Sequence, residues 1–547
     1  TALMATGYAW ALKRAGEGSM AVAQMGDGTL GEGAVYEALT FASLLSAPVL
    51  FLLEWNGYAQ STDVTATTPG DVVERVRGFG LRVQRTADRD PERLCAELGE
   101  AVACVRGGEP TMVIIDTRRL MAHSKGDDDR PAAVLEALNA EDPLNRHLEA
   151  PDARARYEAI AAELATIGDE VSARPQLAWE DAPALPDGAV PFDGLEAHAD
   201  VGDGVEARVV SELGAGLRAL LESDPRVTVL GEDLADPYGG AFKVTRGLSS
   251  DFGPRVFSTP ISEAAIVGVA GGAALAGDRP VAEIMFGDFC TLAADQLINH
   301  AAKFHYMYGG DDVRCPLTVR LASGARRGYG PTHSQSLESL FCGVPGLRVL
   351  ALSGRHRPRA LLERAARDDA PVLFVENKLL YGEQPATRPP LNLEPHAPGE
   401  PEPFGPLCYR PRQGRAADLT VVTYGGSAPI AEQAMHDAFV EEELEPDYFV
   451  LTQLWPLTVN AIARSARATG RLIVIEEGNA AYGVGAAVIA AVCQQLGAAR
   501  LASAALGAAP TPIPCARQLE DAALPSPDAV LDAMRRLVGG SRACRPT

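Results

Sequence analysis

The pattern of apolar and polar residues near the start of the chain predicts a strand, a helix and a second strand. Residues 19–25 form a mostly apolar run that ends at a glycine, and residues 33–46 carry apolar side chains at helical spacing. Residues 49–55 are apolar except for Glu54, which suits a buried parallel strand. The segment therefore predicts a βαβ unit, in which ligands bind at the carboxyl ends of the strands.

The alternation of strands and helices continues along the first part of the chain. Its further expected elements are strands at 80–85 and 111–116 and helices at 91–105 and 153–173. After the last helix the chain is rich in Pro, Gly and acidic residues and has no periodicity. We therefore predict a first domain over residues 1–150, and a helix with an acidic tether over residues 151–205.

A second alternating region follows the tether. We predict a domain over residues 206–385, a Pro-rich connector over residues 386–415 and a last domain over residues 416–547. The expected strands of these regions lie at 227–231, 281–286, 317–321, 347–351, 418–425, 447–454 and 471–478. The whole chain is predicted to be an α/β protein with doubly wound, mostly parallel sheets in three domains.

The composition is that of a globular protein and argues against several classes. The 547 residues are 47% hydrophobic and carry a formal net charge of −23, whereas a nucleic-acid partner would require surplus Lys and Arg. Nine cysteines without CxxC pairs indicate reduced thiols in a cytoplasmic protein and no structural zinc. No apolar run approaches the ~20 residues of a membrane span, and the start of the chain resembles no signal or transit peptide. The acidity favours solubility or attraction of a basic partner domain.

Oxygen ligands for a cation are expected at the ends of the first two strands. Asp27 offers a carboxylate, Asn56 an amide oxygen and the turn at Tyr58 a backbone carbonyl. Mg²⁺ accepts such a set when diphosphate oxygens and water complete its octahedron. Gly26 and Gly28 would let a phosphate approach the backbone closely. In a chain with 54 glycines the triplet alone predicts only a turn, and the following helix, strand and Asn-Gly-Tyr favour the metal site.

Residues 26–62 resemble the thiamine-diphosphate motif in the α-type half of the decarboxylating first component of 2-oxoacid dehydrogenase complexes. Other segments resemble the phosphate-side loop of that half and several parts of the β-type half. These segments are residues 119–130, 255–289, 331–339, 422–435 and 509–530. The likeness covers nearly the whole chain in family order. It implies a thiamine-diphosphate-binding fold with both halves fused in one chain.

The start of the chain differs from this family. Residues 1–13 are expected to form the helix that precedes the first strand of the sheet. Family members carry a long block before this point, with further diphosphate contacts and a bulky apolar residue that bends the cofactor. We therefore expect the α-type half to be N-terminally incomplete, with these contacts absent from the sequence or supplied by another chain.

The resemblance implies thiamine diphosphate and Mg²⁺ as cofactors and assigns Glu263 to ring nitrogen N1′ of the aminopyrimidine. Residues 260–267 are apolar, and a desolvated carboxyl there would share a proton with the ring. From the residues alone, a carboxylate stabilised at a helix N-terminus is an equally good interpretation. Phe289 falls where the family places an aromatic ring against the pyrimidine, and its alternative is a core phenylalanine.

Two of the nine histidines lie in family motifs. The resemblance places His123 near the diphosphate and thiazolium. It implies that His333 transfers protons to or from the substrate or the acyl acceptor. Arg119 would pair with a phosphate or carboxylate, although it could equally be a solvated basic residue. Some relatives are phosphorylated at the position of Ser124, but nothing in the sequence indicates regulation.

Departures from the family motifs concern the substrate more than the cofactor. Met285 stands where relatives often have a polar side chain, and Arg326 and Arg327 precede His333. We expect these three residues at the substrate pocket. An arginine-rich mouth would suit a phosphorylated sugar as readily as a branched oxo acid, so the substrate stays open.

The resemblance implies decarboxylation of a 2-oxo acid and transfer of the acyl group to a lipoyl-bearing acyltransferase partner. Family members build the cofactor site between an α-type and a β-type half, so a homodimer is expected. The alternative is a transketolase-like transfer of a two-carbon ketol unit from a ketose phosphate to a carrier protein. A non-catalytic assembly subunit is a third possibility, against which the joint presence of Asp27, Asn56, Glu263, His123 and His333 argues.

Overall fold

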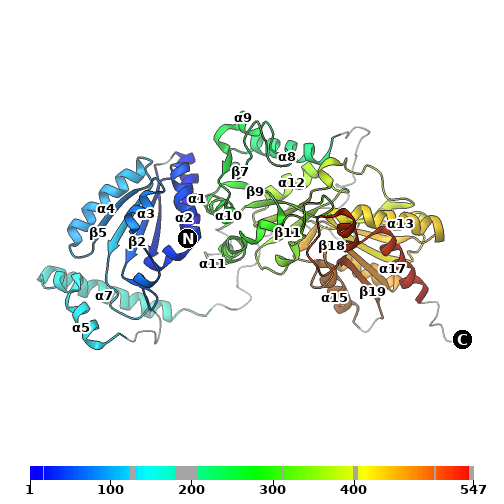
Figure 1. Ribbon diagram of the computed structural model, residues 1–547. Helices are drawn as coiled ribbons and strands as arrows, with labels where there is room; N and C mark the ends of the chain where they lie inside the picture. The colour runs from blue at the N-terminus through cyan, green and yellow to red at the C-terminus, as the bar shows by residue number, and fades with distance from the viewer. Residues whose placement is uncertain are drawn as a thin grey trace. The chain divides into compact units, whose positions relative to one another are not determined.

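The chain divides into two compact units, Thr1–Ala184 and Leu185–Thr547, which are described separately (Figure 1). The computed structural model describes residues 1–16, 18–123, 130–176, 178, 207–308, 313–397, 404–497 and 500–540. Most of the predicted tether and Ser124 lie outside these residues.

Unit 1 is built on a four-stranded parallel sheet of order β1-β2-β6-β5. Its strands are β1 (Ala21–Gly26), β2 (Val49–Trp55), β5 (Arg82–Ala87) and β6 (Thr111–Asp116). The helices are α1 (Ala2–Ala15), α2 (Gly33–Leu45), α3 (Val72–Arg77) and α4 (Pro91–Arg106). The βαβ unit predicted from the apolar pattern is confirmed, because β1 and β2 pair in parallel with α2 between them in the chain, and most apolar residues of α2 and β2 are buried.

Three helices follow the sheet of unit 1: α5 (Ala132–Ala140), α6 (Pro143–His147) and α7 (Pro151–Ser172). The predicted helix over residues 153–173 is confirmed by α7. Ala153 is its one buried residue, and a row of apolar side chains at helical spacing is exposed along it. These side chains are Tyr157, Ile160, Leu164, Ile167 and Val171.

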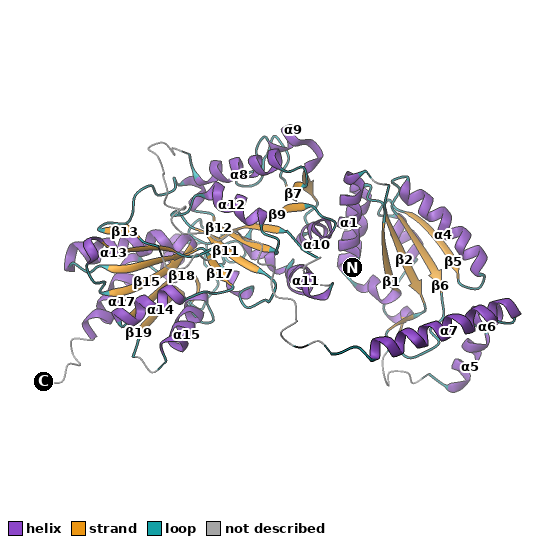
Figure 2. Ribbon diagram, turned by 180° about the vertical axis from the view of Figure 1, so that it is seen from behind, coloured by secondary structure: helices purple, strands orange, loops and turns teal. Residues whose placement is uncertain are grey.

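The first sheet of unit 2 has seven strands in the order β17-β11-β12-β10-β9-β7-β8, and all pairs are parallel except β11 with β17 (Figure 2). The strands are β7 (Val227–Glu232), β8 (Val256–Thr259), β9 (Arg279–Ile284), β10 (Thr318–Ser323), β11 (Arg348–Leu352), β12 (Val372–Asn377) and β17 (Gln453–Trp455). The helices are α8 (Val209–Ser223), α9 (Leu248–Phe252), α10 (Glu263–Leu275), α11 (Phe304–Met307) and α12 (Pro358–Arg367).

The second sheet of unit 2 has six strands in the order β13-β14-β16-β15-β18-β19. The strands are β13 (Leu393–Pro395), β14 (Leu407–Pro411), β15 (Leu419–Tyr424), β16 (Pro446–Leu451), β18 (Arg471–Asn479) and β19 (Ala502–Ala508). The helices are α13 (Ala428–Glu442), α14 (Asn460–Thr469), α15 (Val484–Leu496), α16 (Arg517–Ala523) and α17 (Pro527–Gly540). The connector predicted over residues 386–415 contains β13 and β14, which extend this sheet by antiparallel pairing.

The single strand predicted over residues 447–454 is wrong, because the chain changes sheets within it. β16 pairs in the second sheet, and β17 pairs with β11 in the first. Thr452 lies between them, buried, and its hydroxyl donates to the carbonyl of Gly405. An uninterrupted apolar run gives no signal of such a crossing, because both strands are buried.

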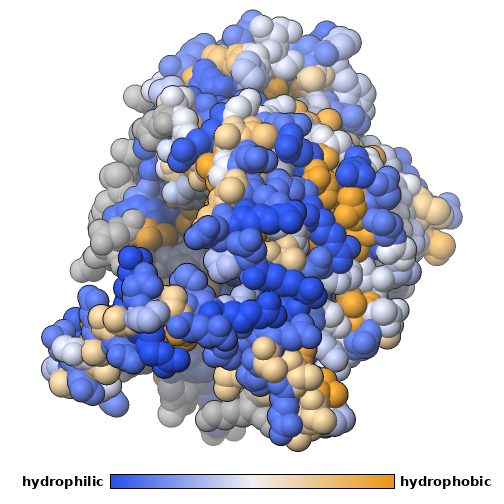
Figure 3. Space-filling view, turned by 90° about the vertical axis from the view of Figure 1, so that its left-hand side faces the viewer, coloured by the Kyte–Doolittle hydropathy of each residue, from blue (hydrophilic) through white to orange (hydrophobic). Residues whose placement is uncertain are grey.

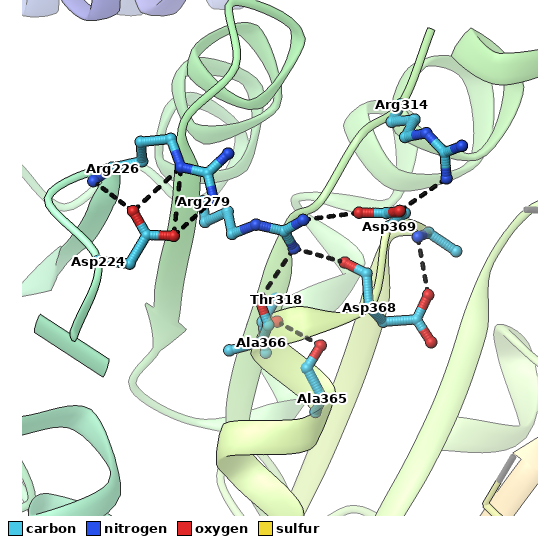
Figure 4. A network of polar contacts seen from close by, with 10 residues as sticks. Asp224, Arg226, Arg279, Arg314, Thr318, Ala365, Ala366, Asp368 and Asp369 are labelled. Atoms are coloured by element: carbon cyan, nitrogen blue, oxygen red, sulfur yellow. Dashed lines mark hydrogen bonds and ion pairs between the residues drawn. The ribbon is translucent and has the colours of Figure 1, made fainter. Parts of the chain in front are cut away.

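A polar network joins the amino ends of the strands in the first sheet of unit 2 (Figure 4). Arg279, the first residue of β9, donates to a carboxylate oxygen of Asp369 at 2.7 Å and to the carbonyl of Asp368 at 3.3 Å. Arg314 pairs with the other oxygen of Asp369 at 2.6 Å, and Arg348 lies 2.9 Å from the Asp368 carboxylate. These ion pairs hold the end of the sheet opposite to the carboxyl ends, where α/β proteins bind ligands.

The face of the molecule drawn in Figure 3 is mainly hydrophilic, with smaller hydrophobic patches between the polar side chains. Within the described ranges, the helices include none that is long and apolar enough to cross a membrane.

Candidate active site

Asp27 lies at the carboxyl end of β1 and is 1% exposed. Its Oδ2 accepts hydrogen bonds from the backbone N–H groups of Asn56, at 3.0 Å, and Gly57, at 2.7 Å. Among the described residues, its buried Oδ1 has no hydrogen-bond partner. A buried carboxylate oxygen without a partner is costly, so this atom is suited to bind a cation or a further hydrogen-bond donor.

Asn56 follows β2, the neighbour of β1 in the sheet, and the structure therefore brings it beside Asp27 as predicted. Its Oδ1 accepts from the backbone N–H of Tyr58 at 3.0 Å, which shapes the turn that carries the Tyr58 carbonyl. In the part of the chain that is described, no group of three or more His, Cys, Asp or Glu residues is placed to hold a metal ion. A cation at Asp27 would therefore need amide, carbonyl and non-protein oxygens, the donor set that suits Mg²⁺.

The two glycines beside Asp27 differ in their surroundings. A Cβ at Gly28 would lie 3.1 Å from the Cβ of Ala59, so this glycine lets the short hairpin of β3 (Tyr58–Ala59) and β4 (Thr62–Asp63) pack closely. A Cβ at Gly26 would meet nothing within 4 Å. The space in front of Gly26 is therefore open to a ligand.

Arg119 lies on the loop after β6 and faces the ring of Tyr58. Its guanidinium carbon is 5.1 Å from the ring centroid, and its Nη1 donates to the carbonyl of Gln60. Arg130, which the motif analysis did not single out, lies over the same ring at 5.5 Å and donates to the carbonyl of Arg119 at 2.7 Å. The two cations give the turn at Tyr58 a positive rim. His123 is exposed on the same loop.

In unit 2 the candidate residues gather at the carboxyl ends of the strands. Glu263 is the first residue of α10, after β8, and is 7% exposed. It is therefore both buried and at a helix N-terminus, so the two interpretations of this residue are compatible. Glu232 ends β7 and is 6% exposed, and within the described ranges its Oε1 has no hydrogen-bond partner. Burial, followed by the negative charge of Glu263, raises the pKa of Glu232 to about 7. Sequence analysis missed Glu232, because only the pairing of β7 with β8 places it near Glu263.

His333 lies on the loop after β10 in an aromatic cluster. Its ring meets those of Phe286 and Phe289 edge to face, with centroids 4.6 and 5.2 Å apart. The hydroxyl of Thr332 lies 2.8 Å from Nδ1 of His333. Tyr329 packs edge-on against Phe286 at 5.8 Å. The structure thus brings Phe289 and His333 together, two residues that come from separate sequence motifs.

Two charged side chains form hydrogen bonds with the backbone of the loop that carries His333. Asp288 accepts from the backbone N–H of Gln335 at 3.1 Å, and burial raises the pKa of Asp288 above its ordinary value. Lys378, directly after β12, donates from Nζ to the carbonyl of His333 at 2.8 Å. Lys378 is completely buried, and this burial lowers its pKa to about 8. Sequence analysis missed Lys378, since a lysine after a strand carries no local signal.

The three residues expected at the substrate pocket fall in different places. Met285 is half-buried directly after β9, one residue before Phe286. Arg327 donates to the carbonyl of Lys378 at 2.8 Å. Arg326 donates instead to the carbonyl of Pro525 at 2.7 Å and lines a cavity of about 340 Å³, to which no residue of the aromatic cluster contributes. The structure therefore does not bring Arg326 to His333.

Three family models match successive parts of the chain. "Dehydrogenase E1 component" matches residues 1–150, "Transketolase, pyrimidine binding domain" matches residues 208–384, and "Transketolase, C-terminal domain" matches residues 410–530.

The second half of the chain is similar to beta subunits of known enzymes. The pyruvate dehydrogenase E1 component subunit beta of Rickettsia bellii is 37% identical over 57% of this chain and 93% of its own length. The acetoin:2,6-dichlorophenolindophenol oxidoreductase subunit beta of Cupriavidus necator is 37% identical over 58% of this chain and 94% of its own length.

The fold is that of solved transketolases. The enzyme of Campylobacter jejuni matches with a TM-score of 0.64 and 16% identity, over 99% of this chain and 81% of its own. The transketolase of Leishmania mexicana matches with a TM-score of 0.62 and 16% identity, over 98% of this chain and 80% of its own. The beta-subunit relatives and the three successive family matches show that the chain belongs to the thiamine-diphosphate-dependent E1 component family of the 2-oxoacid dehydrogenases, with an alpha-type and a beta-type half in one polypeptide.

Proposed function

We propose that this chain decarboxylates a 2-oxo acid with thiamine diphosphate and Mg²⁺ and transfers the acyl group to a lipoyl-bearing acyltransferase partner. Family membership supports the class of reaction. The observation that carries the proposal is the buried Oδ1 of Asp27, which no described residue bonds, in a chain that also holds a buried Glu263 at the N-terminus of α10. The first residue offers a cation site for a diphosphate, and the second offers a carboxyl for a pyrimidine.

At the diphosphate end, Asp27, Asn56 and the main chain of Tyr58 would hold Mg²⁺. The ion would satisfy the free oxygen of Asp27, whose other oxygen is already bound by two backbone N–H groups. Arg119 would add positive charge beside the phosphates, and His123 would lie near the diphosphate and the thiazolium.

At the pyrimidine end, Glu263 would hold a proton at ring nitrogen N1′ and Phe289 would pack against the ring. Glu232 lies close enough for the two negative charges to interact, and its pKa of about 7 lets it carry a proton near neutral pH. Bound thiamine diphosphate supplies a carbon nucleophile for the carbonyl of the 2-oxo acid and accepts the electrons released with carbon dioxide.

His333 would exchange a proton with the substrate or the acyl acceptor. The rings of Phe286 and Phe289 shield its imidazole from water on two sides. Because Nδ1 of His333 contacts the Thr332 hydroxyl, Nε2 would be the nitrogen that exchanges the proton. Met285 and Arg327 lie near enough to this cluster for us to propose them as substrate-pocket residues.

A homodimer is proposed as the working assembly, since relatives of this class combine an α-type and a β-type half at each site. The substrate is proposed to be a small 2-oxo acid. The relative from Rickettsia bellii is named a pyruvate dehydrogenase component, which makes pyruvate the first compound to assay.

The proposal is tested by supplying the purified chain with thiamine diphosphate and Mg²⁺ and following carbon dioxide release. We expect release from 2-oxo acids and none from ketose phosphates. Turnover of a ketose phosphate without carbon dioxide would replace the proposal by a transketolase-like transfer of a two-carbon ketol unit. Cofactor binding without turnover of either class would favour a non-catalytic subunit.

A further inference from the structure

A buried lysine lies beneath the loop that carries His333. The side chain of Lys378 is 0% exposed and is one of the largest fully buried side chains of the chain. Burying an ammonium group is costly, and an apolar side chain of the same length would fill the space without this cost. We therefore expect the positive charge and the N–H donors of the Lys378 ammonium group to have a function.

Lys378 contacts the loop after β10 at three points. Its backbone N–H donates to the carbonyl of Ser323, the last residue of β10, at 3.0 Å. Its carbonyl accepts from Arg327 at 2.8 Å, and its Nζ donates to the carbonyl of His333 at 2.8 Å. One residue thus holds the beginning, the middle and the histidine of this loop.

Burial disfavours the charged form of Nζ, and nearby carboxylates partly offset this effect. Asp288 and Glu477 attract the ammonium group most strongly, Glu520 also attracts it, and Arg327 repels it. Nζ lies 5.5 Å from the ring centroid of Phe286 and 6.0 Å from that of Tyr329. Both rings belong to the cluster that surrounds His333.

We propose that Lys378 is a positioning residue that holds His333 in the aromatic cluster through its ammonium group. Asp288 adds to the support, because it accepts from the backbone N–H of Gln335, two residues after His333. The ammonium group does not touch the imidazole, so it acts through the backbone of the loop. The inference rests on the proposed role of His333 in turnover.

The first measurement needs no substrate. We expect diethyl pyrocarbonate to modify His333 several-fold faster in Lys378→Met than in the unchanged chain, as measured by peptide mass spectrometry. Lys378→Arg keeps a charged donor and should restore most of the protection. Lys303→Met removes an exposed lysine that bonds to Asn299, and it should change nothing. An unchanged rate in Lys378→Met would overturn the proposal.

The second measurement uses turnover. Loss of the correct histidine position should lower kcat by about 100-fold in Lys378→Met, with a small change in KM. In Lys378→Arg, any alkaline loss of kcat near pH 8 should move to higher pH, because arginine stays charged. A purely structural role would not move this limb. If Lys378→Met does not fold, Lys378→Gln takes its place in both measurements.

The two measurements separate this inference from the proposed function. If the unchanged chain turns over no 2-oxo acid while His333 modification still depends on residue 378, the proposed reaction fails and the positioning role stands. If turnover of 2-oxo acids is normal in Lys378→Met, the positioning role fails and the reaction stands.

Discussion

At the turn after β1, backbone donors hold one oxygen of Asp27, and no described residue is a partner of the other, buried oxygen. At the loop after β10, buried charged side chains hold the carbonyl of His333 and the backbone N–H of Gln335. Among the described residues, Oδ1 of Asp27 is open to a ligand, whereas in the second region the chain itself supplies the groups that bind the His333 carbonyl and the Gln335 N–H. We therefore expect the first region to respond to Mg²⁺ and the second to pH.

The largest expected effect comes from replacing Glu263 by Gln. The amide keeps the size of the side chain but cannot exchange a proton with a ring nitrogen, so turnover should fall by at least about 100-fold. Binding of thiamine diphosphate in Mg²⁺ buffer, measured by calorimetry, should stay nearly unchanged, because the metal turn is intact. Normal turnover in Glu263→Gln would refute the proposed role of this carboxyl.

A smaller but still large effect is expected for Asp27→Asn. The amide removes the negative charge that would hold the cation, and its N–H₂ group opposes either the backbone donors or the metal. Calorimetry should show a loss of Mg²⁺-dependent cofactor binding of about 100-fold. Asp90→Asn, at the exposed N-cap of α4 in the same unit, serves as the matched control. Equal cofactor binding by Asp27→Asn and the control would refute the proposed metal site.

The sequence predicted the metal turn better than the pocket of His333, for a physical reason. Asp27 and Asn56 follow strands that are consecutive in the chain and adjacent in the sheet, so local pattern alone brings them together. Lys378 lies 45 residues from His333, and Glu232 reaches Glu263 only through strand pairing. Buried charges of this kind have no periodicity, and only the folded sheet reveals them.

The same reasoning explains which elements of the fold were predicted. The buried strands and amphipathic helices follow from apolar runs and spacing, and they are confirmed through most of the described chain. The crossing between β16 and β17, and the two strands inside the Pro-rich connector, depend on which sheet edge is free to pair. A sequence window carries no information about that edge.

The free energy of unfolding should depend on pH through Glu338, a buried carboxyl that follows His333 in the chain. Burial raises the pKa of Glu338 from 4.5 to about 7. The hydroxyl of Tyr424 lies 2.8 Å from Oε1 of Glu338 and 3.1 Å from Oε2 of Glu476. One hydroxyl proton cannot serve two carboxylates, so a second proton belongs on one of them. Glu476 accepts two backbone N–H groups at the start of α15, which leaves that proton to Glu338.

The sign of the effect follows from the raised pKa. Folded protein binds the proton of Glu338 more tightly than unfolded protein, so its contribution to stability is full below about pH 4.5 and is lost as pH rises through about 7. We expect the midpoint of thermal unfolding to fall by a few degrees over this range. In Glu338→Gln the fall should be smaller, while Glu158→Gln, exposed on α7, should behave as the unchanged chain. Equal slopes in all three would exclude Glu338 as the source.

The smallest effect tests how Tyr58 acts at the metal turn. If the metal ligand is its backbone carbonyl, the side chain contributes only through the two guanidinium groups that lie over its ring. Tyr58→Phe keeps the ring and should leave the Kd for thiamine diphosphate in Mg²⁺ buffer nearly unchanged. Tyr58→Ala removes it and should weaken binding by about 0.5–1 kcal/mol, because Arg119 and Arg130 lose their common platform. A loss in Tyr58→Phe as large as that in Asp27→Asn would place the phenol oxygen, instead of the carbonyl, on the cation. The turn would then depend on side chains as much as the pocket of His333 does.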